Sequence, residues 1–213
     1  MKQYPSIVGS TQAPRKPCIA FQKLDGSNLR FEWQRKTGWQ KKYGSRQRLF
    51  DETDEMLGPS IPIFYETLAD PIEAIIRGDK WLRQQQRVTV FAEFFGPKSF
   101  AGNHDLEPGN EPMELRLFDV WVYKYGLIGP RDFIKTFGHL PTPEVVYEGN
   151  LNAEFIADVK AGRYNLGDGI EEGVVCKGGK GGHRDLWMAK IKTDAYIAKL
   201  KEVFRVGWEQ YAE

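Results

Sequence analysis

The sequence predicts an α+β protein with mainly antiparallel sheets, and three observations support this fold class. Segments typical of strands outnumber those typical of helices. Neighbouring strand segments are joined by short turns such as Asp25-Gly26 and Thr37-Gly38, and such turns favour antiparallel pairing. With 213 residues, 41% of them hydrophobic, the chain can bury one large core. We therefore expect a single domain over residues 1–213.

The expected strands are apolar or alternating runs that end at turn residues. They cover residues 18–23, 28–36, 87–95, 115–123, 173–177 and 186–192. The last two are expected to form a hairpin through the glycine-rich residues 178–182. Residues 1–17 and the polar segment 98–112 are expected to be irregular.

The expected helices have apolar residues at helical spacing or recognisable end signals. Residues 61–77 show the spacing, with an interruption at Pro71. A short helix is expected to open at Pro130 and end at Gly138. Asn152 and Thr193 are expected caps for two more, the last with Ile197, Leu200 and Phe204 on one face.

The charge is nearly balanced, at +1, but it is unevenly distributed. Residues 23–48 hold eight Lys or Arg against two acids, and residues 177–205 hold eight against three. If these segments converge they favour a polyanionic partner, and otherwise they are solvated faces. Cys18 and Cys176 cannot form a disulfide framework or a four-ligand zinc site. No signal peptide or membrane-spanning run is found, so a cytoplasmic protein without membrane contact is expected.

Several short motifs place chemically useful side chains at strand ends. Lys23 ends a strand just before Asp25-Gly26, where lost hydration can make an amine nucleophilic, although such a lysine is more often simply solvated. Glu93 lies inside the apolar run 91–95, either for a ligand hydroxyl or as an edge-strand acid facing water. Phe118 could stack on a nucleobase or be an ordinary core aromatic.

Two later motifs could bind a metal ion and phosphates. Glu171 and Glu172 enter a strand that ends in Lys177, and these acids could hold a divalent cation. Lys190 and Lys192 share one face of the next strand, which suits an anion between them or a solvent-facing strand.

The motifs are weak one by one, but their order resembles that of the covalent nucleotidyltransferases. That superfamily contains ATP-dependent RNA ligases, DNA ligases and mRNA capping enzymes. The resemblance covers about residues 18–205: Lys-x-Asp-Gly, a strand Glu before Gly, Phe-Asp, Glu-Gly-Val-Val-x-Lys and Lys-x-Lys. It implies the adenylyltransferase fold, with antiparallel sheets flanked by helices around a nucleotide cleft.

The resemblance also implies roles for particular residues. Lys23 would attack the α-phosphate of ATP and form a lysyl–AMP intermediate, and Glu172 would help to bind Mg²⁺ or Mn²⁺. Glu93 would bind the ribose and Phe118 would stack on adenine. Arg46 would contact the ribose or the incoming end, with Arg30 and Arg48 as neighbouring alternatives. The phosphates would be bound by Lys177, Lys190 and Lys192, of which the last two, with Lys23, are the expected catalytic lysines.

Within this superfamily the sequence looks more like an RNA ligase. Asn28 stands where DNA ligases usually carry arginine, and Glu93 lacks a preceding Asp-Gly. Only 21 residues follow Lys192, so no C-terminal OB-fold or helical domain is expected, and a partner protein could supply one. The expected substrate is RNA with 5′-phosphate and 3′-OH ends, or DNA or RNA/DNA nicks. A minimal DNA ligase and a non-catalytic nucleic-acid-binding subunit are the alternatives, and ATP against GTP stays open.

Overall fold

Two separate β-sheets organise the chain in the computed structural model, which describes residues 1–96, 112–164 and 172–209. The contacts between Cα atoms divide the chain into two units. Unit 1 contains residues 1–5, 26–142 and 181–184, and unit 2 contains residues 6–25, 143–180 and those from 185 onward. The expected α+β class with mainly antiparallel sheets is confirmed, whereas the single domain stays a prediction.

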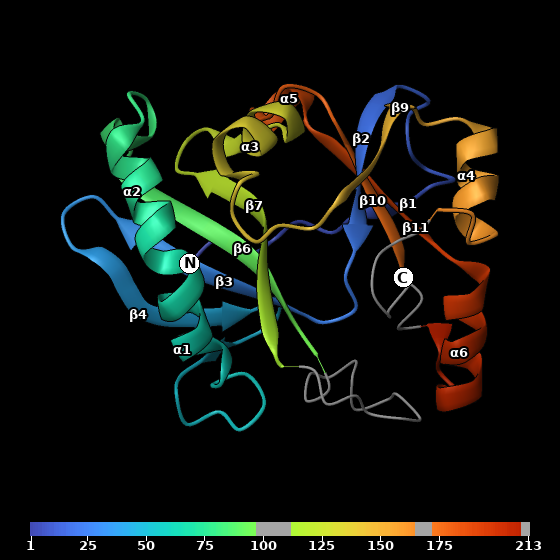
Figure 1. The fold of residues 1–213 in the computed structure, drawn as a ribbon, viewed down its shortest axis with the longest axis horizontal. Helices are drawn as coiled ribbons and strands as arrows, with labels where there is room; N and C mark the ends of the chain where they lie inside the picture. Colours follow the sequence, from blue (N-terminus) through green and yellow to red (C-terminus); the bar gives the residue numbers. More distant parts are fainter. Residues whose placement is uncertain (97–111, 165–171, 210–213) are drawn as a thin grey trace. The chain divides into compact units, whose positions relative to one another are not determined.

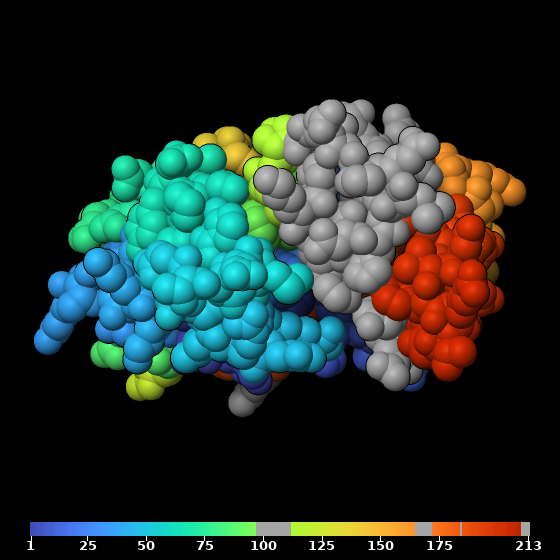
Figure 2. Space-filling view, turned by 90° about the horizontal axis from the view of Figure 1, so that it is seen from below, coloured from blue at the N-terminus to red at the C-terminus, as the bar shows by residue number. Residues whose placement is uncertain are grey.

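Unit 1 is built on a six-stranded antiparallel sheet in the order β5-β4-β3-β6-β7-β8 (Figure 1). Its strands are β3 (Ser27–Gln34), β4 (Gly38–Ser45), β5 (Leu49–Phe50), β6 (Arg87–Phe95), β7 (Glu114–Val122) and β8 (Gly126–Leu127). The tip of the β3–β4 hairpin, in blue, projects at the left of Figure 2. Arg35 and Lys36 are exposed at this tip, and Lys41 and Lys42 are exposed along β4.

A helical layer covers one face of this sheet. It consists of α1 (Ser60–Phe64), the π-helical turn η1 (Tyr65–Ala69) and α2 (Asp70–Gly78). The fully buried Phe64 ring stacks on Phe31 of β3 with the ring centroids 3.8 Å apart, so apolar burial holds the layer to the sheet. The short elements η2 (Leu82–Gln84) and α3 (Pro130–Phe137) complete unit 1.

The helical segment corrects one expectation. Pro71 does not end it: Pro71 is the second residue of α2 and directly follows the π-helical turn η1, where the i→i−4 hydrogen-bond pattern already changes. The helical path runs without a break from Ser60 to Gly78 and departs from α geometry only in the π-helical turn. The helix opened by Pro130 is confirmed, with Gly138 as its C-cap.

Unit 2 is built on a five-stranded sheet in the order β1-β11-β10-β2-β9. Its strands are β1 (Val8–Gly9), β2 (Pro17–Lys23), β9 (Val145–Asn150), β10 (Gly173–Gly178) and β11 (Trp187–Lys192). Only β1, paired with β11, is parallel to its neighbour. Helix α4 (Ala153–Lys160) packs on one face through Phe155 and Val159, over Cys18, Ala20, Val174 and Cys176 (Figure 1).

The ends of the unit 2 helices follow the sequence signals. Asn152 caps α4 and Thr193 caps α6 (Asp194–Phe204), each with its side chain accepting a backbone N–H. The β10–β11 connection is longer than the expected glycine turn and contains the short helix α5 (Gly182–Asp185). On α6 the buried residues are Tyr196 and Leu200 rather than the expected Ile197 and Phe204.

Other differences concern polar edges of the sheets. Strands β4 and β9 are absent from the expected set because their exposed residues break the apolar alternation. The strand expected to reach Lys36 ends at Gln34. The expected loop 98–112 lies outside the described residues except for Pro112. Within the described ranges, no helix has the length and apolar character needed to cross a membrane.

Candidate active site

Four lysines of unit 2 lie on the same face of three adjacent strands, opposite the face that α4 covers. Side chains alternate along a strand, and Cys18, Ala20, Cys176, Ala189 and Ile191 all face the α4 side. The residues at the alternate positions of these strands therefore face away from α4. These are the lysines that the sequence singled out: Lys23 on β2, Lys177 on β10, and Lys190 and Lys192 on β11.

A row of three residues crosses the sheet where these strands begin or end. Gly173 on β10 pairs with Lys23 on one side and with Lys192 on the other. Gly173 has φ +146°, and a Cβ built on it would lie 1.9 Å from the carbonyl oxygen of Ile191. Only glycine fits there, so the glycine of the Glu-Gly motif is required by the backbone.

Glu172 lies next to Gly173 and bridges the two lysines of the row. Its Oε2 accepts from Lys23 Nζ at 2.5 Å, and its Oε1 accepts from Lys192 Nζ at 2.9 Å. The Glu172 side chain is only 4% exposed and that of Lys192 8%, whereas that of Lys23 is 23% exposed. Lys23 is thus the member of this trio that is most open to a reactant.

Burial changes the acidity of Lys192 within this trio and of Asp25 beside it. Burial, and then the charge of Glu172, raise the pKa of Asp25 to about 6, although a hydrogen bond from Tyr196 works in the opposite direction. Burial also lowers the pKa of Lys192, and the charge of Lys23 adds to that effect, against the charge of Glu172. Positive charge on either lysine disfavours positive charge on the other, and a neutral Lys23 is what nucleophilic attack requires.

Lys177 and Lys190 extend the positive face. Lys177 is 3% exposed, and its Nζ lies 4.9 Å from the centre of the Phe21 ring, a cation–π contact. Lys190 is half-buried. It pairs with Val175, which lies two residues before Lys177 on β10. The four cations provide a surface on which a chain of phosphates would be neutralised.

The carboxylates of this face are chemically suited to Mg²⁺ or Mn²⁺. Glu172 and Asp25 supply oxygen donors close enough for their charges to interact. In the described part of the chain no cluster of three or more His, Cys, Asp or Glu side chains is found. A hard divalent ion that keeps several waters and also binds substrate phosphates needs only one or two carboxylates. The expected ligand Glu172 thus fits, with Asp25 as a second donor; Glu171 lies outside the described residues.

Unit 1 carries the residues expected to contact the nucleoside. Phe91 pairs with Asp119 and Ala92 pairs with Leu117, so Phe118 is the extra residue of a β-bulge. A bulge turns two successive side chains toward the same face. Ring contacts confirm this for Phe118, which lies 6.3 Å from Phe91 at an interplanar angle of 30°.

Tyr4 from the N-terminal segment joins this group, which sequence reasoning missed. Its ring makes edge contacts with Phe91 and Phe118, at 4.9 and 5.1 Å, and its hydroxyl donates to the buried carboxylate of Asp119. Burial and the charges of Asp119 and Glu93 raise the pKa of Tyr4 well above its ordinary value. The hydroxyl therefore stays protonated. Phe118, the bulge residue, is held by ring contacts with Phe91 and Tyr4.

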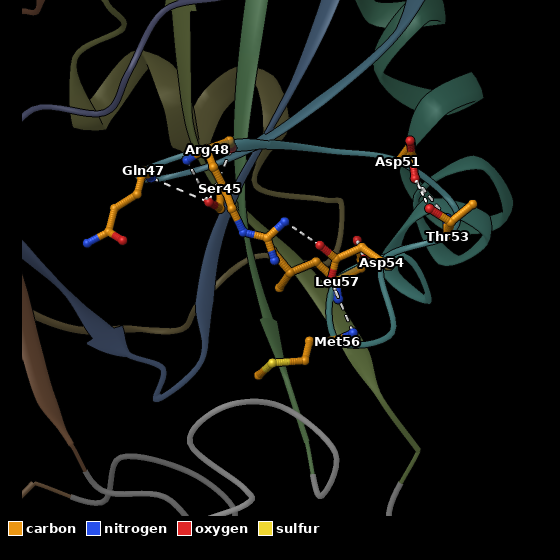
Figure 3. A network of polar contacts seen from close by, with 9 residues as sticks. Ser45, Gln47, Arg48, Asp51, Thr53, Asp54, Met56 and Leu57 are labelled. Carbon is orange, nitrogen blue, oxygen red and sulfur yellow. Dashed lines mark hydrogen bonds and ion pairs between the residues drawn. The ribbon is translucent and has the colours of Figure 1, made fainter.

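Arg46 lies at the exposed tip of the β4–β5 turn. Figure 3 shows how Ser45 shapes the turn by accepting the backbone N–H groups of Gln47 and Arg48. The Arg48 guanidinium pairs with Asp54, whose carboxylate also accepts two backbone N–H groups. Arg30 is 4% exposed, with its Nε so close to Gly44 that a Cβ there would clash. Of the three arginines considered from the sequence, Arg46 and Arg48 are exposed, and Arg48 is paired with Asp54.

The structure therefore brings together part of the expected site. Lys23, Glu172 and Lys192 are in direct contact, with Lys177 and Lys190 on the same face. Glu93 and Phe118 belong to the other unit, as does Arg46. The convergence of all these residues around one nucleotide stays a prediction. Asp25, Tyr196 and Tyr4 were missed, and only Asp25, in Lys-x-Asp-Gly, stood in a motif that could have drawn attention to it.

The fold is similar to the folds of solved RNA and DNA ligases. The chain is similar to an apo form of Naegleria gruberi RNA ligase, with a TM-score of 0.65 and 15% identity over 95% of the chain and 58% of that protein. A form of that ligase with ATP and Mn gives a TM-score of 0.61 and 14% identity over 89% of the chain and 53% of that protein. A putative ATP-dependent DNA ligase from Aquifex aeolicus gives 0.61 and 18% over 100% of the chain and 57% of that protein.

A family model described as RNA ligase matches residues 16–192, and the chain belongs to this family. No curated protein sequence matches the chain. The chain spans somewhat more than half the length of the similar solved ligases. The match includes Lys23, Glu172 and Lys192, the trio in direct contact.

Proposed function

We propose that this chain carries out the nucleotidyl-transfer chemistry of an ATP-dependent RNA ligase. The observation that carries the proposal is the row Lys23–Gly173–Lys192 with Glu172 bridging the two ammonium groups. A nucleophilic amine beside a second buried cation and a carboxylate is what phosphoryl transfer to lysine needs. A protein that only binds nucleic acid needs no such trio.

In the first step Nζ of Lys23 would lose a proton to water and form a bond to the α-phosphorus of ATP. The bond from that phosphorus to the bridging oxygen breaks, and pyrophosphate leaves. Lys192 would neutralise charge on the α-phosphate, while Lys177 and Lys190 would hold the outer phosphates. A divalent ion at Glu172 and Asp25 would supply further positive charge for the phosphates.

The AMP would then pass to the 5′-phosphate of an RNA end, and a 3′-OH would displace it to seal the strand. Glu93 would bind the ribose, Phe118 would stack on the adenine and Arg46 would contact the ribose or the incoming end. The exposed basic hairpin tip of unit 1 supports a polyanionic partner. With only two cysteines, and therefore no disulfide framework, the expected location is the cytoplasm.

The test is the mass of the protein after incubation with ATP and Mg²⁺. We expect wild type to gain one AMP, and Lys23→Ala to gain none while unfolding at the same temperature as wild type. Lys16→Ala is the matched control, since Lys16 is an exposed lysine near the start of the same strand. An adduct that survives in Lys23→Ala would place the nucleophile elsewhere, and no adduct in wild type with ATP or GTP would refute the proposal.

A further inference from the structure

Tyr196 has no role in the chemistry described so far, yet it lies against two of the groups on the lysine face. It belongs to the first turn of α6, four residues after Lys192, and is only 9% exposed. Its hydroxyl is hydrogen-bonded to the carboxylate of Asp25. The Nζ atom of Lys192 lies 5.0 Å from the centre of its ring.

The backbone fixes Tyr196 relative to Glu172 through Thr193. The N–H of Thr193 donates to the carbonyl oxygen of Glu172 at 3.0 Å, and the N–H of Tyr196 donates to Oγ1 of Thr193 at 3.1 Å. Thr193 is fully buried. The N-cap residue Thr193 thus connects Glu172 to Tyr196. Tyr196 therefore has little freedom to move independently of Glu172.

The two ends of the tyrosine contact groups of opposite charge. Lys192 is held by the ring and by Glu172 Oε1 at 2.9 Å, so the position of its ammonium group is defined from two sides. Asp25 lies two residues after the nucleophile Lys23. Its carboxylate is held by the hydroxyl of Tyr196. A tyrosine suits this place because its ring attracts a cation while its hydroxyl donates to an anion.

We propose that Tyr196 is a positioning residue that holds the Asp25 carboxylate for the divalent ion and the Lys192 ammonium for the phosphates. The inference rests on the proposed function, since it assigns a role within the same site. The hydroxyl and the ring act on different ligands. Removing the hydroxyl weakens the use of the divalent ion, and removing the ring weakens the binding of the nucleotide phosphates.

Two substitutions separate these contributions. Tyr196→Phe keeps the ring and removes the hydrogen bond to Asp25. We expect it to raise the Mg²⁺ concentration for half-maximal adenylylation about tenfold, with the KM for ATP unchanged at saturating Mg²⁺. Tyr196→Leu removes both contacts. It should raise the Mg²⁺ concentration for half-maximal adenylylation by a similar factor, and it should also raise the KM for ATP about fivefold.

Tyr147→Phe is the matched control in the same unit. Tyr147 also donates from its hydroxyl, to the carbonyl oxygen of Asn150 at 3.0 Å, and its ring stacks on Phe155. Tyr147→Phe should leave both the half-maximal Mg²⁺ concentration and the KM for ATP unchanged. If Tyr196→Phe behaves like this control, or if it raises the KM for ATP as much as Tyr196→Leu does, the division of roles is wrong.

A binding experiment keeps the inference apart from the proposed function. Calorimetric titration with ATP and Mg²⁺ is run on wild type, Tyr196→Phe, Asp25→Asn and the double variant. If the hydroxyl acts through Asp25, Tyr196→Phe has no further effect in the Asp25→Asn background, whereas independent effects of the two changes would overturn the inference. Wild type that binds ATP without forming an adduct would refute the proposed function alone.

Discussion

The ammonium group of Lys23 donates to one carboxylate oxygen of Glu172 at 2.5 Å, although 149 residues separate them in the chain. The antiparallel pairing of β2 and β10 produces this contact, because Gly173 is the register partner of Lys23. The same carboxylate holds Lys192. One acidic side chain therefore organises two cations that would otherwise repel each other.

Glu172→Gln tests this arrangement through stability and metal dependence. The amide cannot balance two lysines, of which Lys192 is buried, so we expect the unfolding free energy to fall by about 2–4 kcal/mol. Adenylylation at saturating ATP should fall at least about a hundredfold, more than ATP binding does. The measurements are urea denaturation and single-turnover adduct formation at several Mg²⁺ concentrations. Normal turnover with weaker ATP binding would contradict the assigned role of Glu172.

Gly173→Ala tests the backbone requirement of the row Lys23–Gly173–Lys192. An added Cβ would lie 1.9 Å from the Ile191 carbonyl oxygen, at a φ that L-residues rarely adopt. We expect a loss of about 3 kcal/mol or more in unfolding free energy, together with loss of the adduct. Gly9→Ala, in the same sheet, is the control because the nearest atom to its Cβ is 4.0 Å away. Equal stability of the two variants would show that β10 can shift without cost.

The sequence predicted much of unit 2 because its motifs lie on regular strands. Alternation alone places Lys190 and Lys192 on one face, and the cap at Thr193 was visible in the sequence. The contact of Lys23 with Glu172 depends on strand register, which no local pattern determines. The bulge at Phe118 was hidden for the same reason, since a bulge exists only relative to the partner strand.

Aromatic residues show the other limit of sequence reasoning. Tyr4 lies four residues before the first strand, in a segment expected to be irregular, yet it packs on Phe118. Tyr196 directly precedes Ile197 and was not among the residues expected on the apolar face of its helix. Helical spacing identifies a face, but it does not reveal which polar groups a tyrosine will contact.

Asp25 gives the protein a pH-dependent stability. Its pKa in the folded state is about 6, above the value of 3.8 for an unperturbed side chain. Between these values the folded state binds more protons than the unfolded state, so stability falls as pH rises from 4 to 6. We expect this group to account for up to about 3 kcal/mol over that range, and the dependence to disappear in Asp25→Asn. Denaturant titrations of both proteins without divalent ions measure it, and parallel pH profiles would contradict the assignment.

The last prediction concerns the polymer that is sealed. Asn28 on β3 pairs in register with Glu93 on β6, and among the described residues no hydrogen-bond partner is found for its buried Oδ1. A buried amide oxygen without a partner is costly, and a hydroxyl group of a bound ligand would satisfy it. Of the two polymers compared, only RNA carries a 2′-OH at the 3′-OH end, and this is such a group. We therefore expect a 5′-phosphate nick with ribose at the 3′-OH end to be sealed about tenfold faster than the all-DNA nick at the same salt concentration.

Asn28→Ala should lose most of this preference while retaining the AMP adduct. Single-turnover sealing of the two nicks by wild type and by Asn28→Ala measures the preference. Equal or faster sealing of the all-DNA nick by wild type would identify the protein as a minimal DNA ligase.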